Sequence, residues 1–378
     1  MKRSERDLAR VDRRAVVLAL AVVLQIVVAA ATADALGVPG SDSSAAKLAE
    51  WGRDHGMNGL VSWLEALQYD RDPPRLGGVP AGGIPLAAGA VPATRPGDSA
   101  LERLPEPLVP LADGPRLPGE GVWTTVVAAG GKPAVQVAEL RPDPQHTSFV
   151  VGVMRMDPAL VRGELHPGTR DPGGTWQAAT SLAGAAGTNL AAVFNGGFRL
   201  NDPSHNGYLS EGRTVAPLVP GAASLVIYTD GRADVGSWGR EVRMTPQVAS
   251  VRQNLQLLVD GGQVAPSCAT GGQAQWGNTL GQAAFIQRSA FGITAGGLLV
   301  YVGGPALSVC SLGAVLRDAG VTRGMELDIN PDWVSGAYFT GAEHGTPQGF
   351  RLFPAEKVPP DHYFAPSSRD FFAWYLRP

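Results

Sequence analysis

The sequence contains little cysteine and no surplus of basic charge, and both shortages exclude classes of protein. Two cysteines among 378 residues are too few for a disulfide-dense miniprotein or for a structural zinc site built from cysteine alone. With 31 basic and 34 acidic side chains, the chain has a formal net charge of −3. It therefore lacks the positive excess on which binding by counterion release depends, and we expect no nucleic-acid partner.

Long regular helices are also expected to be rare, because glycine and proline interrupt the chain throughout. The 49 glycines and 31 prolines favour turns, and the overall composition excludes collagen, a coiled coil and a polytopic membrane protein. Hydrophobic residues make up 44% of the chain and charged residues 17%, so it can form a core rather than remain disordered.

One long apolar run is present near the amino terminus, at residues 15–33. As a helix, its 19 residues would rise about 28 Å, roughly one hydrocarbon core. Six basic residues between positions 2 and 14 precede it and favour insertion with the amino terminus inside. The pattern predicts a cytoplasmic basic tail at 1–14 and a transmembrane signal anchor at 15–34, with the rest of the chain extracytoplasmic. Small residues at 31–33 leave cleavage and secretion as the alternative.

The two cysteines, Cys268 and Cys310, both lie in the part that is expected to be exported. An oxidising compartment would allow them to pair, so a disulfide is predicted, with two buried thiols as the alternative. No histidine lies at ligand spacing near either cysteine, so metal binding through them is not expected.

Composition divides the remaining chain into three regions. Residues 41–70 have apolar residues at helical spacing and predict a short helical stalk. Residues 71–121 are dense in proline and glycine without a sustained period, which is typical of a linker. Residues 122–378 contain many short strand-like runs with a few helical segments between them, and we predict an α+β domain with mixed β-sheets and a few flanking helices.

Two loops in this domain carry residues suited to ligand binding. Asn195-Gly196-Gly197-Phe198 directly follows a strand-like run, and glycines there would let the backbone approach a ligand, although the same letters also form ordinary turns. Arg288, followed by Ser289, could contact a phosphate bidentately or could serve as a surface ion-pair partner.

A third segment places acidic residues close together. In a strand, Glu326, Asp328 and Asn330 would share one face, with the two carboxylates roughly 6–7 Å apart. In a dry site the carboxylates would repel and raise one pKa, whereas a solvated edge strand would leave them without a role. Asp328, Asn330 and Asp332 also have the spacing that begins a calcium loop, but Pro331 interrupts it. We therefore expect no cofactor and no metal site, with a divalent cation as the alternative.

Taken together, these segments resemble a known family. The chain contains, in order, AVFNGGF, a TDGR hairpin, an LVDGG turn, RSAFGIT and an MELD strand, and this order is similar to that of the phosphodiester glycosidase family. The resemblance covers roughly residues 147–353. It implies that the motif positions are Asn195, Gly196, Gly197, Phe198, Arg288, Ser289 and Asp328.

The chain departs from this family after Asp328. Where the family typically has LDGGGS, this sequence has Leu-Asp-Ile-Asn-Pro-Asp-Trp at 327–333. Pro331 removes a backbone N–H donor and Ile329 adds bulk, so either the substrate differs or catalysis has been lost.

The resemblance implies an exported, membrane-tethered glycosidase that hydrolyses a glycosyl phosphodiester in envelope glycans. In this interpretation Asp328 is catalytic with Glu326 assisting, and Arg288 contacts the phosphate. The remaining predicted substrate-binding residues are Asn195, Gly196, Gly197, Phe198, Ser289 and Asn330. The alternative is a non-catalytic domain that binds an envelope polymer or a protein. The catalytic interpretation requires residues 326–328 to lie beside the turn at 195–197.

Overall fold

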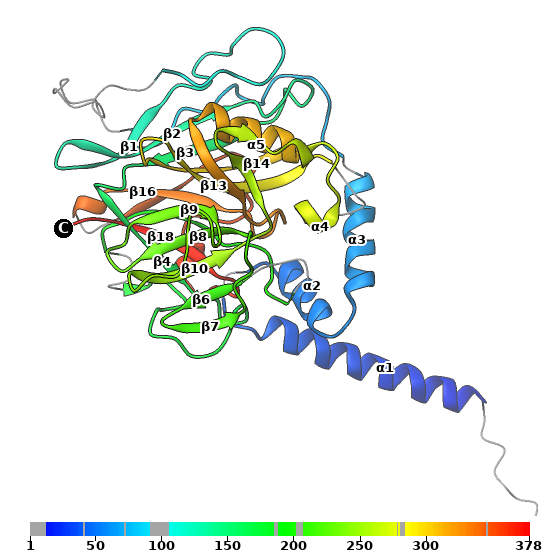
Figure 1. The fold of residues 1–378 in the computed structure, drawn as a ribbon. Helices are drawn as coiled ribbons and strands as arrows, with labels where there is room; N and C mark the ends of the chain where they lie inside the picture. Colours follow the sequence, from blue (N-terminus) through cyan, green and yellow to red (C-terminus); the bar gives the residue numbers. More distant parts are fainter. Residues whose placement is uncertain are drawn as a thin grey trace, which may run out of the picture.

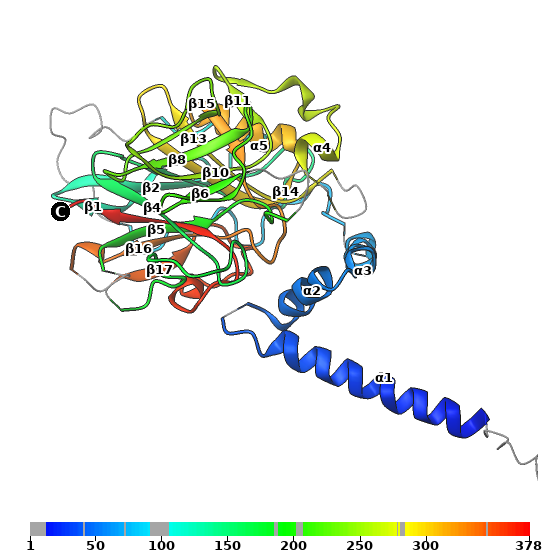
Figure 2. The ribbon, with the colours of Figure 1, turned by 60° about the horizontal axis from the view of Figure 1, so that its bottom comes forward.

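The protein consists of a β-rich body with helices from the amino-terminal part of the chain on one side of it (Figures 1 and 2). The computed structural model describes residues 13–378 except 41, 72, 91–105, 185–187, 202–206, 278, 280–283, 345 and 346. In both views α1 (Arg13–Leu36) projects away from the body, whereas α2 (Ser44–Asp54) and α3 (Asn58–Arg71) lie beside it. Helix α2 begins after Ser43, whose side chain accepts a hydrogen bond from the N–H of Ala46.

The largest sheet joins strands from distant parts of the chain. Its order is β1-β2-β3-β14-β13-β15-β11-β12, and each neighbouring pair is antiparallel. The strands are β1 (Thr124–Ala129), β2 (Lys132–Leu140), β3 (Val151–Met156), β11 (Leu257–Asp260), β12 (Gln263–Val264), β13 (Ile286–Thr294), β14 (Leu299–Leu307) and β15 (Val321–Glu326). Helix α5 (Val309–Asp318) packs on this sheet through buried Leu312, Val315 and Leu316.

Two five-stranded sheets complete the body, and their pairs are also antiparallel. The first, in the order β7-β6-β10-β8-β9, contains β6 (Tyr208–Ser210), β7 (Arg213–Ala216), β8 (Ala223–Tyr228), β9 (Ala233–Ser237) and β10 (Val248–Gln253). The second, in the order β17-β16-β5-β18-β4, contains β4 (Val161–His166), β5 (Leu190–Asn195), β16 (Gly336–Thr340), β17 (Gln348–Arg351) and β18 (Phe371–Leu376). A short helix, α4 (Gln273–Trp276), follows β12.

Aromatic side chains join the largest sheet to the sheet that contains β5. Phe194 of β5 stacks on Phe291 of β13 and Tyr301 of β14, with ring centroids 5.2 and 4.6 Å apart. Trp374 of β18 also stacks on Phe291, with ring centroids 5.7 Å apart. All four rings are fully buried. Each aromatic pair contributes about 0.5–1.5 kcal/mol beyond its buried area, so this cluster fixes how the two sheets pack.

The fold-class prediction is wrong, because the described residues form mostly β-structure with few helices, and the three sheets are antiparallel rather than mixed. Parallel pairs need a crossover of a dozen or more residues, usually a helix. Here β8 and β9 instead meet at a tight turn that contains Asp230 and Gly231, and other consecutive strands are joined in the same way. The glycine-rich turns therefore specify hairpins, whose strands must be antiparallel.

The predicted transmembrane anchor at 15–34 is wrong as well. These residues lie in α1, but no helix among the described residues is long and apolar enough to cross a membrane. Most of the predicted basic tail at 1–14 lies outside the described residues.

The predicted disulfide is confirmed. Cys268 and Cys310 are bonded, with Cα atoms 5.0 Å apart, and Cys310 lies in the first turn of α5. The described parts of the predicted linker at 71–121 follow the surface of the body without forming a strand and hydrogen-bond to it. For example, Thr147 donates to the carbonyl of Gly78 and Tyr338 to that of Ala88.

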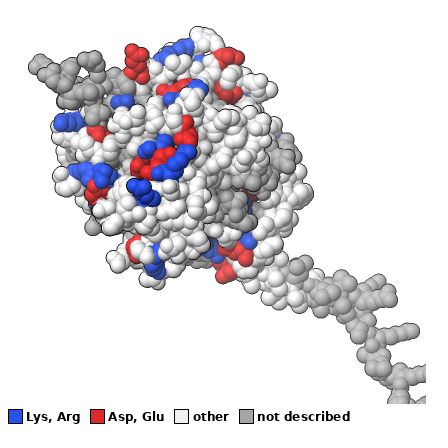
Figure 3. All heavy atoms as spheres, viewed as in Figure 1, with Lys and Arg blue, Asp and Glu red and all other residues white. Residues whose placement is uncertain are grey.

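Charged side chains on the face shown in Figure 3 form mixed clusters of both signs. Several charges in the structure belong to exposed ion pairs, such as Arg232 with Asp230 at 2.6 Å and Arg240 with Asp260 at 2.5 Å. Exposed pairs contribute little to stability, because water and salt screen them. The ion pairs that matter for chemistry are therefore the buried ones described next.

Candidate functional site

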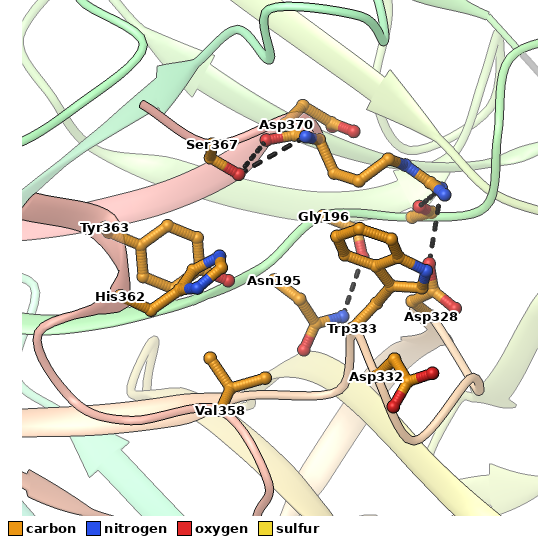
Figure 4. Close-up of a pocket in the computed structure, with 12 residues that line it drawn as sticks. Asn195, Gly196, Asp328, Asp332, Trp333, Val358, His362, Tyr363, Ser367 and Asp370 are labelled. Atoms are coloured by element: carbon orange, nitrogen blue, oxygen red, sulfur yellow. Dashed lines mark hydrogen bonds and ion pairs between the residues drawn. The ribbon is translucent and has the colours of Figure 1, made fainter. Parts of the chain in front are cut away.

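A small pocket lies where β5 and β15 end and β18 begins (Figure 4). Its cavity volume is about 10 Å³, roughly the room that one water molecule needs, and Asn195, Asp328 and Trp333 are among the side chains around it. The complete lining is Asn195, Gly196, Gly197, Asp328, Asp332, Trp333, Val358, His362, Tyr363, Ser367, Arg369 and Asp370.

Backbone hydrogen bonds bring three distant loops together at this pocket. Strands β5 and β18 pair with Asn195 opposite Phe371, so the residue after β5 lies beside the residue before β18. There the N–H of Gly196 donates to the carbonyl of Asp370 at 3.0 Å. The N–H of Asp328 in turn donates to the carbonyl of Gly196 at 3.2 Å. The structure thus places Asp328 directly beside the turn at 195–197.

The two glycines of this turn are required by crowding. A Cβ on Gly196 would lie 2.4 Å from Oδ2 of Asp370, and a Cβ on Gly197 would lie 3.1 Å from Oδ1 of Asn254. Neither glycine has a positive φ, so close approach rather than backbone conformation selects glycine here.

Asn195 uses its whole amide within the protein. Its Oδ1 accepts hydrogen bonds from the hydroxyl of Tyr301 at 2.9 Å and from the N–H of Ser335 at 3.1 Å. Its Nδ2 donates to the carbonyl of Gly196 at 2.8 Å and to Oγ of Ser289 at 3.0 Å. Ser289 is fully buried and donates through Oγ to the carbonyl of Asp328 at 2.7 Å. These two residues therefore hold the turn and the Asp328 loop in place.

Asp328 is a buried carboxylate with a cation beside it. Its Oδ1 accepts from the N–H groups of Ile329 at 2.7 Å and Asn330 at 3.0 Å, and its Oδ2 accepts from Nη2 of Arg369 at 3.3 Å. Burial raises the pKa of Asp328 above its ordinary value, although Arg369 and the two N–H groups act in the opposite direction. Of the two predicted catalytic carboxylates, only this one lines the pocket.

Glu326 lies behind the pocket rather than in its wall. Its Oε1 accepts from Nη1 of Arg288 at 2.6 Å, and Nε of Arg288 donates to the carbonyl of Leu307. Both side chains are buried, and burial raises the pKa of Glu326 to about 7 despite the ion pair. Strand β15 ends at Glu326, so the alternation that predicted a shared face with Asp328 does not continue beyond it.

Arg369 is the cation of the pocket, and sequence reasoning did not identify it. Its guanidinium lies 3.3 Å from a carboxylate oxygen of Asp328, 3.5 Å from one of Asp171 and 3.6 Å from one of Glu50. It also lies over the ring of Trp333, 5.4 Å from the centroid. Burial alone would lower the pKa of Arg369, but the surrounding carboxylates raise it, so the side chain stays charged.

A further buried ion pair, between Arg252 and Asp370, lies beside the turn. Nε of Arg252 donates to Oδ2 of Asp370 at 2.8 Å, and both side chains are fully buried. Arg252 also donates to the carbonyl of Phe198, whose N–H donates to Oδ1 of Asn254. Phe198 itself packs in an apolar cluster with Ile329. Its side chain therefore anchors the turn to the loop after β15.

The structure also shows how the residues with calcium-loop spacing are used. Oδ1 of Asp328 accepts two backbone N–H groups, and Oδ1 of Asn330 accepts the N–H of Asp332 at 2.9 Å. In the described part of the chain, no group of three or more acidic, histidine or cysteine side chains could hold a metal ion.

The sequence offered one usable signal for Arg369. Ser367, Ser368, Arg369 and Asp370 form a polar run directly before the aromatic strand β18. Polar side chains in a loop next to a buried strand are typical of functional sites. The aromatic residues of the strand itself, however, indicated only packing in the core.

Comparisons with known proteins identify no family for this chain: no family model matches, and no curated protein matches. Among solved structures, the chain is similar to the zebrafish N-acetylglucosamine-1-phosphodiester alpha-N-acetylglucosaminidase catalytic domain, auto-inhibited by its pro-peptide. That match has a TM-score of 0.43 and 13% identity, and covers 67% of this chain and 86% of the other. A hypothetical protein from Synechocystis matches with a TM-score of 0.38 and 11% identity, over 66% of this chain and 63% of the other.

Proposed function

We propose that this protein is an exported glycosidase that hydrolyses a glycosyl phosphodiester in envelope glycans. The observation that carries the proposal is the pairing of Asp328 with Arg369 in one pocket, beside the backbone of Gly196 and Gly197. A carboxylate and a guanidinium are the two charges that this reaction requires at the sugar and at the phosphate, respectively.

The chemistry needs little more than these two groups. Hydrolysis breaks the bond between the anomeric carbon and the phosphate oxygen, and water forms a new bond to that carbon. The bonding electrons leave with a phosphomonoester, which is a good leaving group and needs little protonation. Asp328 stabilises the positive charge that develops on the sugar and accepts the proton of the attacking water. Arg369 neutralises the charge on the departing phosphate.

The other predicted residues have supporting roles in this proposal. The backbone of Gly197 contacts the substrate, while Asn195 and Ser289 keep the turn rigid. Glu326 and Arg288 assist from behind the pocket, because their ion pair holds the end of β15 from which the Asp328 loop starts. Preorganised charges of this kind lower the barrier because they need not rearrange during the reaction.

Export is part of the proposal and is supported by the disulfide between Cys268 and Cys310. Disulfides form and persist in oxidising compartments outside the cytoplasm and are rare within it. The proposed substrate is accordingly a glycosyl phosphate of the cell envelope.

The test is an assay of the purified protein and its Asp328→Asn variant against a panel of glycosyl phosphodiesters. Loss of the carboxylate is expected to lower kcat by about 10²- to 10⁴-fold, the usual contribution of a positioned acid or base. The matched control is Asp260→Asn, at an exposed residue paired with Arg240, and it should keep full activity.

Full activity of Asp328→Asn would refute the role of this carboxylate. If the wild-type protein hydrolyses no diester but binds an envelope polymer or a protein, the non-catalytic alternative replaces the proposal. The loop with Pro331 after Asp328 favours that alternative, since it differs from the family pattern.

A further inference from the structure

Helix α2 contributes two carboxylates to three arginines of the β-rich body, of which Arg369 lines the pocket. Glu50 is 3% exposed, and its two oxygens lie 3.3 Å from Nη1 of Arg199 and 3.6 Å from Nη1 of Arg369. One turn further along the helix, Asp54 pairs with Arg199 and lies 3.7 Å from Nη1 of Arg170. The acidic side chains of α2 thus face three arginines, Arg170, Arg199 and Arg369, which all belong to the β-rich body.

The contacts of α2 are unusual for a helix that lies on a protein core. A packed helix normally buries apolar side chains and exposes charged ones. Here Glu50 is buried, whereas Leu48 on the same helix is 41% exposed and Trp63 on α3 is 58% exposed. Charge pairing therefore contributes much of what holds α2 at this position. Salt weakens the partly exposed pairs of Asp54 but screens the buried pairs of Glu50 much less, so an anion that displaces the helix must itself pair with the arginines.

The position of Glu50 identifies what the arginines can bind. Its carboxylate bridges the guanidinium groups of Arg199 and Arg369, with one oxygen towards each, and the oxygen towards Arg369 also lies 3.7 Å from Nη1 of Arg53 on the same helix. A phosphate group also presents several oxygens to neighbouring guanidinium groups, and arginine pairs are a common way of binding it. The same guanidinium of Arg369 contacts Asp328, so a phosphate in the place of Glu50 would lie next to the proposed catalytic carboxylate.

We propose that Arg199 and Arg369 form a phosphate-binding subsite that Glu50 of α2 fills in this structure, with Asp54 and Arg170 extending the contact. This inference rests on the proposed function for the identity of the natural ligand, a phosphoryl group attached to a sugar. The subsite itself depends only on the arginines and on the carboxylate between them. Phosphate and α2 then compete for the same two cations.

The carboxylates of α2 should therefore set the affinity for phosphate. The test compares binding of inorganic phosphate and of glucose 1-phosphate to the full chain by calorimetry, in the wild type and in the double variant Glu50→Gln/Asp54→Asn. Removing the two competing charges is expected to tighten phosphate binding at least tenfold. Adding Arg199→Gln to the double variant should abolish that gain, because it removes one of the two cations of the subsite.

The matched control is Asp318→Asn, because Asp318 of α5 pairs with Arg317 of the same helix at 2.8 Å and, within the described part of the chain, forms no ion pair with the arginines of the subsite. It should bind phosphate as the wild type does. Equal phosphate affinity in the wild type and the double variant would overturn the proposal. So would a gain that persists after Arg199→Gln.

A second measurement needs no variant and covers the case in which the double variant fails to fold. Hydrogen exchange of residues 44–54 in the wild-type protein should accelerate at saturating phosphate, because the ligand displaces the helix. Unchanged exchange would contradict the competition. Tight phosphate binding without hydrolysis of any diester would leave the subsite established and refute only the proposed function.

Discussion

At the scale of single residues, Glu326 and Asp328 show how the environment of a carboxylate determines its role. Asp328 has a cation and two N–H groups beside it and lines the pocket. Glu326, two positions earlier, is closed off behind the pocket, and its Oε2 accepts no hydrogen bond within the described part of the chain. The spacing of the two residues suggested a shared function. In the structure Asp328 lines the pocket, whereas Glu326 is buried behind it and pairs with Arg288.

The pKa of Glu326 predicts how stability changes with pH. Because this pKa is about 7 in the folded protein against 4.5 for an unperturbed glutamate, the folded state holds the proton more tightly. The stabilisation is fully present below pH 4.5 and is lost as the pH rises towards 7. The Glu326→Gln variant cannot ionise at this position, so its free energy of unfolding should fall less than that of the wild type as the pH rises. The difference between the two decreases is up to roughly 3 kcal/mol.

Urea unfolding of both proteins at pH 5 and pH 8 measures this difference. The exposed Glu106→Gln serves as the control and should follow the wild type. A wild-type protein and a Glu326→Gln variant with the same pH dependence would show that Glu326 is ionised throughout.

Among secondary-structure elements, the pairing of β5 with β18 positions the site. The sequence predicted a strand-like run directly before the Asn195 loop, and β5 is present there, because an apolar run is a local signal. That β18 would lie beside β5 was not predictable, since its residues are nearly 180 positions away in the sequence. The same applies to α2, whose helical character is visible in sequence but whose buried carboxylate is not.

The disulfide links two elements and should stabilise the edge of the largest sheet. It joins the segment after β12 to the first turn of α5, across 42 residues. Replacing both cysteines, Cys268→Ser/Cys310→Ser, is expected to lower the free energy of unfolding by about 2–4 kcal/mol, mainly through a freer unfolded chain. Urea unfolding under oxidising conditions measures this, and the wild type with reductant should shift in the same direction. An unchanged midpoint would show that the bond adds nothing to stability.

Across the whole molecule, the site depends on how two sheets pack. The largest sheet supplies the end of β15 and the Ser289 hydrogen bonds, while the sheet with β5 supplies the turn and Arg369. Between them lie the stacked rings of Phe194, Phe291 and Trp374. The distance between Asp328 and the turn therefore depends on a core that contains none of the site residues.

Phe291→Ala tests this dependence. Truncating a fully buried aromatic side chain usually costs about 3–5 kcal/mol, a large part of the stability of a typical domain. We expect a lower melting temperature and weaker binding at the pocket, measured by calorimetry on the same sample. Val215→Ala, at a residue that is 46% exposed, is the control. A stable variant with unchanged binding would show that the two sheets hold their packing without this ring.

The sequence by itself determined the local features of this protein: where strands and turns lie, that only two cysteines are present to pair, and that Asn195, Gly196, Gly197 and Asp328 belong to polar loops. It did not determine the antiparallel arrangement of the sheets, the pairing of Arg288 with Glu326, or the position of Arg369 between Asp328 and Glu50. Local features follow from periodicity and turn conformation, which a few neighbouring residues specify. Which charges meet depends on strand order and register, and only the folded chain decides these.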